Sequence, residues 1–143
     1  MKRNRFYLLF LLFLLAACNS KKHTAPSEND IDAARNFIRA ALDGKFDEAR
    51  TYLFTDSLNN NYMDVAERSY DKADPETKNG YRAASINIHQ VTPVNDSTTV
   101  VIYSNSFKNN HDTLKVIREN GQWLVDPKYL YLNDEDSIQI NKP

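Results

Sequence analysis

The spacing of apolar residues changes once along this chain, near Ser85, and this change restricts the fold more than any other feature. Before Ser85, apolar side chains recur every three or four residues, which is the period of a helix with one buried face. After it, apolar and polar residues alternate in short runs that are separated by turn residues, as in β-strands. Helices followed by strands with short connections predict an α+β fold, in which helices cover one face of an antiparallel sheet.

Capping residues and a glycine mark the first two helices. Asn29 or Asp30 can accept a hydrogen bond at the start of a helix that ends near residue 42. Gly44 can adopt the left-handed conformation that ends such a helix. A second, shorter helix is then expected from Phe46 to about Leu53. The sequence therefore predicts two consecutive helices that are joined by a tight turn.

A third helix is expected over residues 57–72. The side chains predicted on its inner face are Leu58, Tyr62, Val65, Ala66, Ser69 and Tyr70. Pro75 is acceptable in the first turn of a further helical segment. Gly80 follows within this segment and is expected to break it, because glycine is a weak helix former.

Four strands are predicted after the helices, over residues 86–94, 97–107, 112–119 and 122–126. Asn120-Gly121 is the strongest hairpin signal, because both residues accept a positive φ angle. Trp123 follows this turn, and we expect it to face the helices, opposite Phe37 or Ile38. The predicted sheet is an antiparallel meander with one covered face.

The N-terminus has the order of a secretory signal. Three basic residues, Lys2, Arg3 and Arg5, precede an uncharged apolar run over residues 6–15. This run is short for a membrane-spanning helix, and small residues then lead to Cys18, the only cysteine of the chain. The segment resembles the lipobox of bacterial lipoproteins, in which the cysteine receives a diacylglycerol group and becomes the first residue after cleavage. The alternative is an ordinary signal peptide that is cut elsewhere and leaves a free cysteine.

The lipobox resemblance implies a location. Residues 1–17 would form the signal peptide, Cys18 would carry the lipid, and residues 18–28 would be a polar tether to the membrane. A lone cysteine forms no intramolecular disulfide, and acylation would protect it in an oxidising compartment. Asn19 is not the aspartate associated with inner-membrane retention in enteric bacteria. We therefore expect a lipid-anchored protein of the bacterial cell envelope, with the outer membrane favoured over the inner membrane.

Charge and length restrict the partners and the number of domains. The 126 residues from Cys18 onward contain 15 Lys and Arg against 19 Asp and Glu, which gives a net charge of −4. A mildly acidic surface argues against nucleic acid as a partner. The length suits one folded domain, expected over residues 29–132, and a polar tail over 133–143. The acidic run over residues 134–136 lacks the glycine and terminal glutamate of a calcium loop, so a solvated tail is expected.

Two stretches of the chain carry a family resemblance. In the first two helices its residues are Ala33, Phe37, Ile38, Ala41, Leu42, Gly44, Phe46 and Ala49. The second stretch is the run 114–117, followed by Asn120-Gly121 and residues 122–125. Together they resemble the nuclear transport factor 2-like superfamily over about residues 30–130. The resemblance implies a curved sheet around a long helix, with a pocket at the open end. The superfamily includes ketosteroid isomerase, SnoaL-type cyclases and secreted bacterial proteins of unknown function, so the fold does not fix the function.

The implied pocket provides the candidate site. Tyr62 and Tyr103 are the expected wall residues, and His89 is the expected ionisable group near them. The alternatives are tyrosines that pack in the core with their hydroxyls at its rim and a histidine on the surface. No residue matches a catalytic position of the superfamily, so no catalytic residue is assigned. We find no pattern for a metal site and predict no cofactor.

These observations favour a small-ligand-binding or protein-interaction module. Its expected partners are the membrane through the lipid on Cys18, and a small ligand or another envelope protein. A dimer is possible. The alternative function is an enzyme of the isomerase or hydratase type, with its active site in the pocket. Such an enzyme needs a buried ionisable residue that has a hydrogen-bond partner, whereas a binding module needs only apolar walls and a few polar groups.

Three short motifs resemble an O-glycosylation acceptor of bacterial envelope proteins, with aspartate, a hydroxyl residue and an aliphatic residue in succession. They place the acceptor hydroxyl on Ser57, Thr113 and Ser137. The alternative is that each aspartate caps a helix or a turn and that no glycan is involved.

Overall fold

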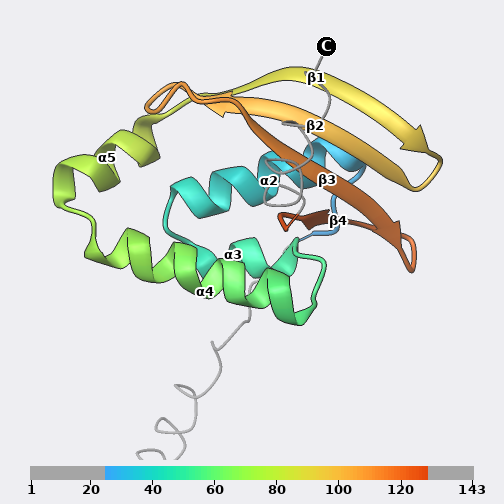
Figure 1. Cartoon of the computed structure of the whole chain (residues 1–143), viewed down its shortest axis with the longest axis horizontal. Helices are drawn as coiled ribbons and strands as arrows, with labels where there is room; N and C mark the ends of the chain where they lie inside the picture. Colours follow the sequence, from blue (N-terminus) through green and yellow to red (C-terminus); the bar gives the residue numbers. More distant parts are fainter. Residues whose placement is uncertain (1–24, 129–143) are drawn as a thin grey trace, which may run out of the picture.

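The computed structural model describes residues 25–128 (Figure 1). Its elements are α2 (Asp30–Leu42), α3 (Phe46–Thr51), α4 (Ser57–Lys72), α5 (Pro75–Ala83), β1 (Ile86–Asn95), β2 (Thr98–Asn105), β3 (Asp112–Glu119) and β4 (Gln122–Asp126). Helices are followed by an antiparallel sheet in the order β1-β2-β3-β4, so the predicted α+β class is confirmed. The predicted signal peptide, Cys18 and the tail over residues 133–143 lie outside the described residues.

Side-chain caps fix where three of the helices begin. Asn29 caps α2, because its Oδ1 accepts the backbone N–H of Asp32 at 2.9 Å. Asp56 and Asp74 cap α4 and α5 by the same geometry, each accepting an N–H three residues later at 2.8 Å. Gly44 has a φ angle of 74° and follows α2, as the sequence predicts. The local sequence therefore determines these boundaries.

The predicted break at Gly80 is wrong, because α5 continues through this residue. A Cβ atom at position 80 would lie 2.4 Å from Cε2 of the Phe107 ring, which follows the end of β2. Phe107 in turn packs edge-on against Tyr81, with the ring centroids 5.1 Å apart. Only glycine lets the Phe107 ring approach the helix this closely. The packing of this ring offsets the cost of a glycine inside a helix, which is about 1 kcal/mol.

The sheet is regular in its centre and irregular in β1. The hairpin turn Asn120-Gly121 joins β3 and β4, both with positive φ angles, as predicted. Pairing of β1 with β2 shifts twice, between Ile88 and Gln90 and between Pro93 and Asn95. At the opposite edge of the sheet, the segment after α3 covers the outer edge of β4. There the N–H of Phe54 donates to Val125 O at 2.8 Å, and the N–H of Val125 donates to Tyr52 O at 2.7 Å.

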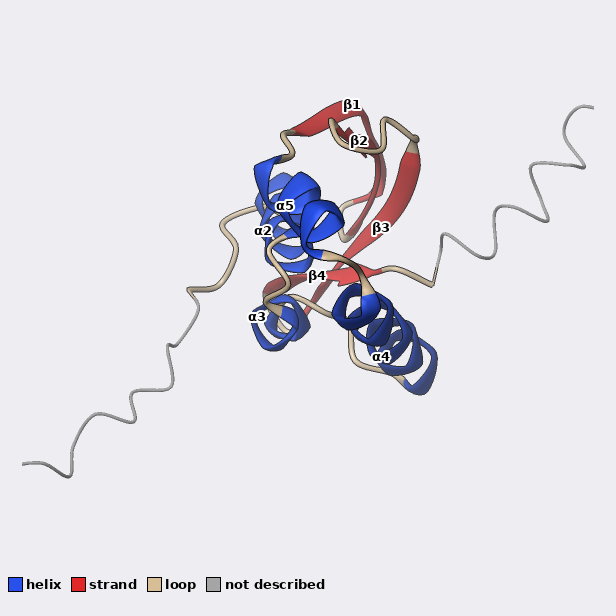
Figure 2. Cartoon of the chain, turned by 90° about the vertical axis from the view of Figure 1, so that its left-hand side faces the viewer, coloured by secondary structure: helices blue, strands red, loops and turns tan. Residues whose placement is uncertain are grey.

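One apolar core joins α2, α3 and α4 to the sheet. Its fully buried side chains include Ala33, Met63, Val101, Val116 and Val125. Figures 1 and 2 both show β1 and β2 at one end of the molecule and α3 and α4 at the other, with α2 beside the sheet. The Thr99 hydroxyl of β2 also donates to the Asp30 carboxylate at 2.5 Å, at the start of α2. This arrangement brings α2, α4 and β2 close enough to enclose a site.

Three of the residues predicted on the inner face of α4, Tyr62, Ala66 and Tyr70, pack against the core, but the buried face is rotated away from Leu58 and Val65. Asn59 and Met63 are fully buried, whereas Leu58 is 63% exposed and Val65 is 47% exposed. Both faces carry apolar residues at helical spacing, so periodicity alone does not choose between them. The buried face is selected by hydrogen bonds of Asn59, which are described below. As a result, α4 presents an apolar stripe to solvent.

Trp123 lies on β4 opposite Arg118, whose guanidinium carbon is 5.7 Å from the ring centroid. Its neighbours around a small hollow include Pro26 and Tyr52, rather than the expected Phe37 or Ile38. The side chain packs against the core but is only half-buried. We therefore expect Trp123→Ala to lower the free energy of unfolding by about 1–3 kcal/mol, less than for a fully buried tryptophan. A urea melt that shows a loss above about 4 kcal/mol would contradict this half-buried placement.

Candidate functional site

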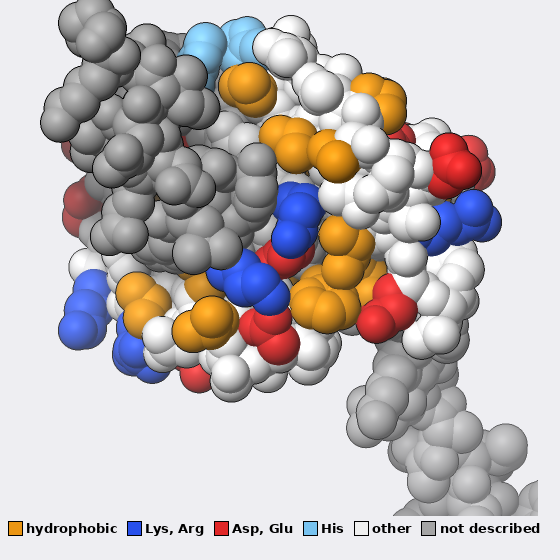
Figure 3. Space-filling view, turned by 45° about the vertical axis from the view of Figure 1, so that its right-hand side comes forward, with side chains coloured by type: hydrophobic (Ala, Val, Ile, Leu, Met, Phe, Trp, Pro, Cys, Tyr) orange, Lys and Arg blue, Asp and Glu red, His pale blue; other side chains and the backbone are white. Residues whose placement is uncertain are grey.

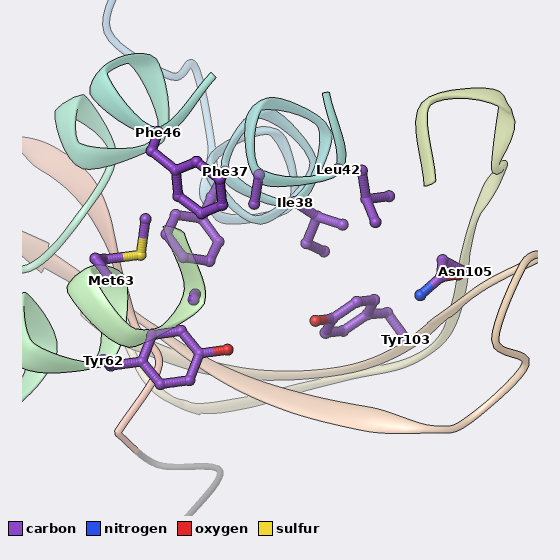
Figure 4. Close-up of a pocket in the computed structure, with 10 residues that line it drawn as sticks. Phe37, Ile38, Leu42, Phe46, Tyr62, Met63, Tyr103 and Asn105 are labelled. Carbon is purple, nitrogen blue, oxygen red and sulfur yellow. The ribbon is translucent and has the colours of Figure 1, made fainter. Parts of the chain in front are cut away.

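A cavity of about 80 Å³ lies between α2, α3, α4 and the end of β2 (Figure 4). The residues that line it are Phe37, Ile38, Ala41, Leu42, Phe46, Tyr62, Met63, Ala66, Tyr103 and Asn105. Six of these ten side chains have no hydrogen-bonding group, and Met63 adds only a weak acceptor sulfur, so the walls are mostly aliphatic or aromatic carbon. The polar groups are the phenols of Tyr62 and Tyr103 and the carboxamide of Asn105. The cavity is partly open to solvent.

The cavity brings together the two tyrosines that the sequence singled out. Tyr62 comes from α4 and Tyr103 from β2, and Figure 4 shows their hydroxyls pointing toward one another across the cavity. Tyr103 is only 9% exposed. Burial raises the pKa of its phenol far above the usual value, and the negative charge of nearby Asp112 and the Tyr62 hydroxyl raise it further. Tyr103 therefore stays protonated over the physiological range and can donate a hydrogen bond into the cavity.

Asn105 supplies the third polar group of the cavity wall. Its Oδ1 accepts the backbone N–H of Phe107 at 3.1 Å and that of Lys108 at 3.0 Å, which fixes the turn after β2. Because these two bonds identify the oxygen, the amide nitrogen must occupy the other branch. Figure 4 shows that nitrogen on the side that faces Tyr103. Asn105 was not expected in the cavity, since its position at the end of a strand indicates only a turn.

His89 does not join these residues, because it is exposed and is not among the residues that line the cavity. Its Nε2 lies 2.8 Å from the Ser104 hydroxyl oxygen, and its ring stacks on that of His111 with the centroids 4.2 Å apart. The two histidines lie together at the surface (Figure 3). The structure therefore separates the expected ionisable group from the tyrosine cavity.

The cavity is too small for a whole ligand of ordinary size. Binding pockets for small molecules usually measure about 300–1,000 Å³, and this one measures about 80 Å³. It has room for a short apolar group that meets two phenols and one carboxamide. The ten side chains that line it include no carboxylate, imidazole, amine or thiol, so none of them is a general base near neutral pH. The arrangement is suited to binding a small group rather than to proton transfer.

A buried polar network between α4 and β4 was also not expected from the sequence. The Asp126 carboxylate is 1% exposed, and Asn59 is fully buried. Asp126 accepts from Asn59 Nδ2 at 3.0 Å, and Lys115 Nζ lies 2.9 Å from its other oxygen. Lys128 Nζ is 3.6 Å from Asp126, and its backbone N–H donates to Asn59 Oδ1 at 3.0 Å. These bonds attach the start of α4 to the end of β4.

The pairing of Lys115 with Asp126 follows from the hairpin sequence. A two-residue turn at 120–121 pairs residue 119 with 122 and therefore places Lys115 opposite Asp126, as observed. Asp56 is the second carboxylate that contacts Lys128, and hydrogen bonds from the Asn59 N–H and from Lys128 lower its pKa. The Lys128 ammonium has a raised pKa, mainly because it bonds to Asp56. The contacts of Asn59 and the Asp56–Lys128 ion pair could not be expected from local sequence, because they join distant parts of the chain.

The three possible glycan acceptors lie in different settings. Ser57 is exposed in the first turn of α4, directly after the capping Asp56, which matches the alternative of a helix cap. Thr113 lies half-buried in β3. Ser137 lies outside the described residues. Glycosylation at these positions stays a prediction.

No family model, no curated protein and no solved structure matched this chain. Among residues 25–128, none of the helices combines the length and the apolar character that a membrane crossing requires.

Proposed function

We propose that this chain is a lipoprotein of the bacterial cell envelope, anchored through Cys18, with the outer membrane favoured over the inner membrane. The basic, apolar and small residues that precede Cys18 support the anchor. The first described helix, α2, begins at Asp30, twelve residues after this cysteine. Twelve extended residues reach about 40 Å, so the domain would be held near the membrane surface.

We further propose that the domain has the nuclear transport factor 2-like arrangement, with N-terminal helices packed on a sheet that curves around α2. The short helix α3 directly follows the turn at Gly44, and Asn120-Gly121 precedes Trp123 in the last hairpin. These are the features that carry the resemblance. The two shifts of register in β1 support the curvature, because irregular pairing bends a strand.

We propose that the domain is a binding module whose ligand or protein partner inserts a small apolar group between Tyr62 and Tyr103. The cavity that these residues line carries this proposal, since it has apolar walls and only three polar groups. The enzyme alternative, an isomerase or hydratase, needs a general base in the same cavity. None of the ten lining side chains offers one, so binding is the better explanation.

Replacement of the anchor cysteine tests the location. We expect Cys18→Ser to move the protein from the membrane fraction to the soluble fraction, because the acylated sulfur is lost while the domain is untouched. Immunoblots of separated fractions and Triton X-114 partition measure this. Ser20→Ala, two residues away, is the matched control and should stay in the membrane fraction. Membrane association of the Cys18→Ser protein at the wild-type level would rule out the lipid anchor.

Filling the cavity tests the binding role. Ala66 lines the cavity, and Ala66→Leu places three further carbon atoms in it. We expect native mass spectrometry of protein purified from its producing cells to show a bound molecule on the wild type and none on this variant. Ala83→Leu, at an exposed position on α5, is the matched control and should keep the bound molecule. A bound molecule that persists in Ala66→Leu, or none in the wild type, would contradict ligand binding in this cavity.

A further inference from the structure

Two hydrogen-bond donors in the cavity wall have no acceptor among residues 25–128. Asn105 is 7% exposed and Tyr103 is 9% exposed, and both line the cavity. The oxygen of the Asn105 carboxamide bonds to the turn after β2, but its nitrogen and the Tyr103 hydroxyl donate to no described residue. A group that fills the cavity displaces water from these donors, so it leaves them unpaired unless it offers an acceptor.

The two donors lie toward opposite ends of the Tyr103 side chain. Tyr103 and Asn105 are two positions apart on β2 and therefore project from the same face of the sheet. Figure 4 shows the Tyr103 hydroxyl pointing toward Tyr62 and the Asn105 nitrogen near the other end of the Tyr103 ring. It also shows Ile38 and Leu42 of α2 across from them. An occupant thus meets donors along β2 and aliphatic carbon along α2.

The cavity is unsuited to a charged group. None of the ten described side chains that line it is a lysine, an arginine or a histidine. Burial and the negative charge of Asp112, which lies opposite on β3, raise the pKa of the Tyr103 phenol. The same two effects disfavour a carboxylate or a phosphate in the cavity. An ammonium group has no acceptor atom, so it leaves the Asn105 N–H groups unpaired.

We propose that the cavity binds the uncharged carbonyl end of an aliphatic molecule, such as an ester or an amide, and rejects the corresponding carboxylate. This assignment rests on the binding function proposed above and names the chemical class of its ligand. A carbonyl oxygen accepts up to two hydrogen bonds without carrying a charge. The carbon atoms beside it pack against apolar wall residues such as Ile38 and Leu42.

The volume of the cavity limits how much of the ligand enters. It measures about 80 Å³, whereas a water molecule in the liquid takes up about 30 Å³. Only a carbonyl group and the few carbon atoms next to it therefore fit, and the rest of a longer molecule lies at the open side. A small ester is accordingly an adequate probe of this site.

Three small probes of similar branched shape test the class of ligand: methyl acetate, propionate and 2-methyl-1-butene. They present an ester, a carboxylate and a hydrocarbon, respectively. NMR titrations of the full chain carrying Cys18→Ser follow the side-chain amide resonances of Asn105. We expect methyl acetate to shift these resonances and to bind at least about tenfold more tightly than propionate, because burial of an unpaired charge is unfavourable. Equal or tighter binding of propionate would overturn the proposal.

Removal of one donor tests the hydrogen bond itself. Tyr103→Phe keeps the aromatic ring, and we expect it to weaken the binding of methyl acetate about fivefold, while 2-methyl-1-butene binds as it does to the wild type. Tyr52→Phe, at a buried tyrosine that does not line the cavity, is the matched control and should bind both probes like the wild type. Equal effects of Tyr103→Phe on both probes would overturn the carbonyl assignment and leave the binding function in place. If no probe shifts the Asn105 resonances, the binding function fails together with the assignment.

Discussion

Replacement of Asp126 by alanine is expected to lower the free energy of unfolding by about 2–4 kcal/mol. The buried carboxylate lies 2.9 Å from the Lys115 ammonium and accepts the Asn59 amide at 3.0 Å, so its loss removes an ion-pair partner of Lys115 and leaves one N–H of the Asn59 amide unsatisfied beside the core. We place the value slightly below the usual range for a broken buried pair, because the two lysines are 29% and 24% exposed and can reach water. Urea unfolding followed by circular dichroism measures the change.

Asp64 provides the matched control for Asp126. It also forms an ion pair, with Arg50 at 2.9 Å, but its side chain is 54% exposed and Arg50 has a second partner in Glu67. Asp64→Ala should therefore change stability by less than about 1 kcal/mol. Asp126→Asn keeps an acceptor for Asn59 and removes the charge, so it separates hydrogen bonding from ion pairing. Equal losses for Asp126→Ala and Asp64→Ala would show that the network contributes no more than a surface pair.

Stability is expected to fall above pH 10 because of Tyr103. Its pKa is raised in the folded state by burial, by Asp112 and by Tyr62, so the folded chain keeps a proton that the unfolded chain releases near pH 10. The stabilising effect is complete below pH 10 and is lost as the pH rises toward the folded-state pKa, at about 1.4 kcal/mol per pH unit. Urea melts between pH 9 and pH 11.5 should show this slope in the difference between the wild type and Tyr103→Phe.

The comparison of the wild type with Tyr103→Phe separates the effect of the Tyr103 hydroxyl from that of the other groups that titrate at alkaline pH. Burial also raises the pKa of Tyr52, and the Lys128 ammonium has a raised pKa, so both variants share the alkaline losses from these groups. If the difference between the wild type and Tyr103→Phe does not change with pH, the hydroxyl of Tyr103 is open to water and does not line a closed wall of the cavity.

Local sequence was sufficient for most of the boundaries of this fold. The caps at Asn29, Asp56 and Asp74 and the turn at Asn120-Gly121 each act within four residues, and each element starts where they indicate. The limits of α4, β3 and β4 agree with the predicted ranges. Such features are readable because the chain satisfies them with its immediate neighbours.

The errors arise where distant parts of the chain decide the outcome. The rotation of α4 depends on Asn59, which bonds to a carboxylate 67 residues away. The helical glycine depends on the ring of Phe107, which comes from the sheet. The cavity has the same origin, because Tyr62 and Tyr103 meet only when α4 and β2 are packed together. His89 was separated from them by its exposed position next to Ser104.

The irregular pairing of β1 has a consequence for how another molecule can be recognised. In the described part of the chain, β4 is covered by the residues after α3, so β1 is the strand with an open edge. That edge contains Pro93, which has no N–H to donate, and its pairing is interrupted twice. A foreign strand aligned along β1 would find broken rows of donors and acceptors, so growth of the sheet from one molecule to the next is disfavoured. A partner of the proposed binding module would therefore be contacted through side chains rather than through main-chain pairing along β1.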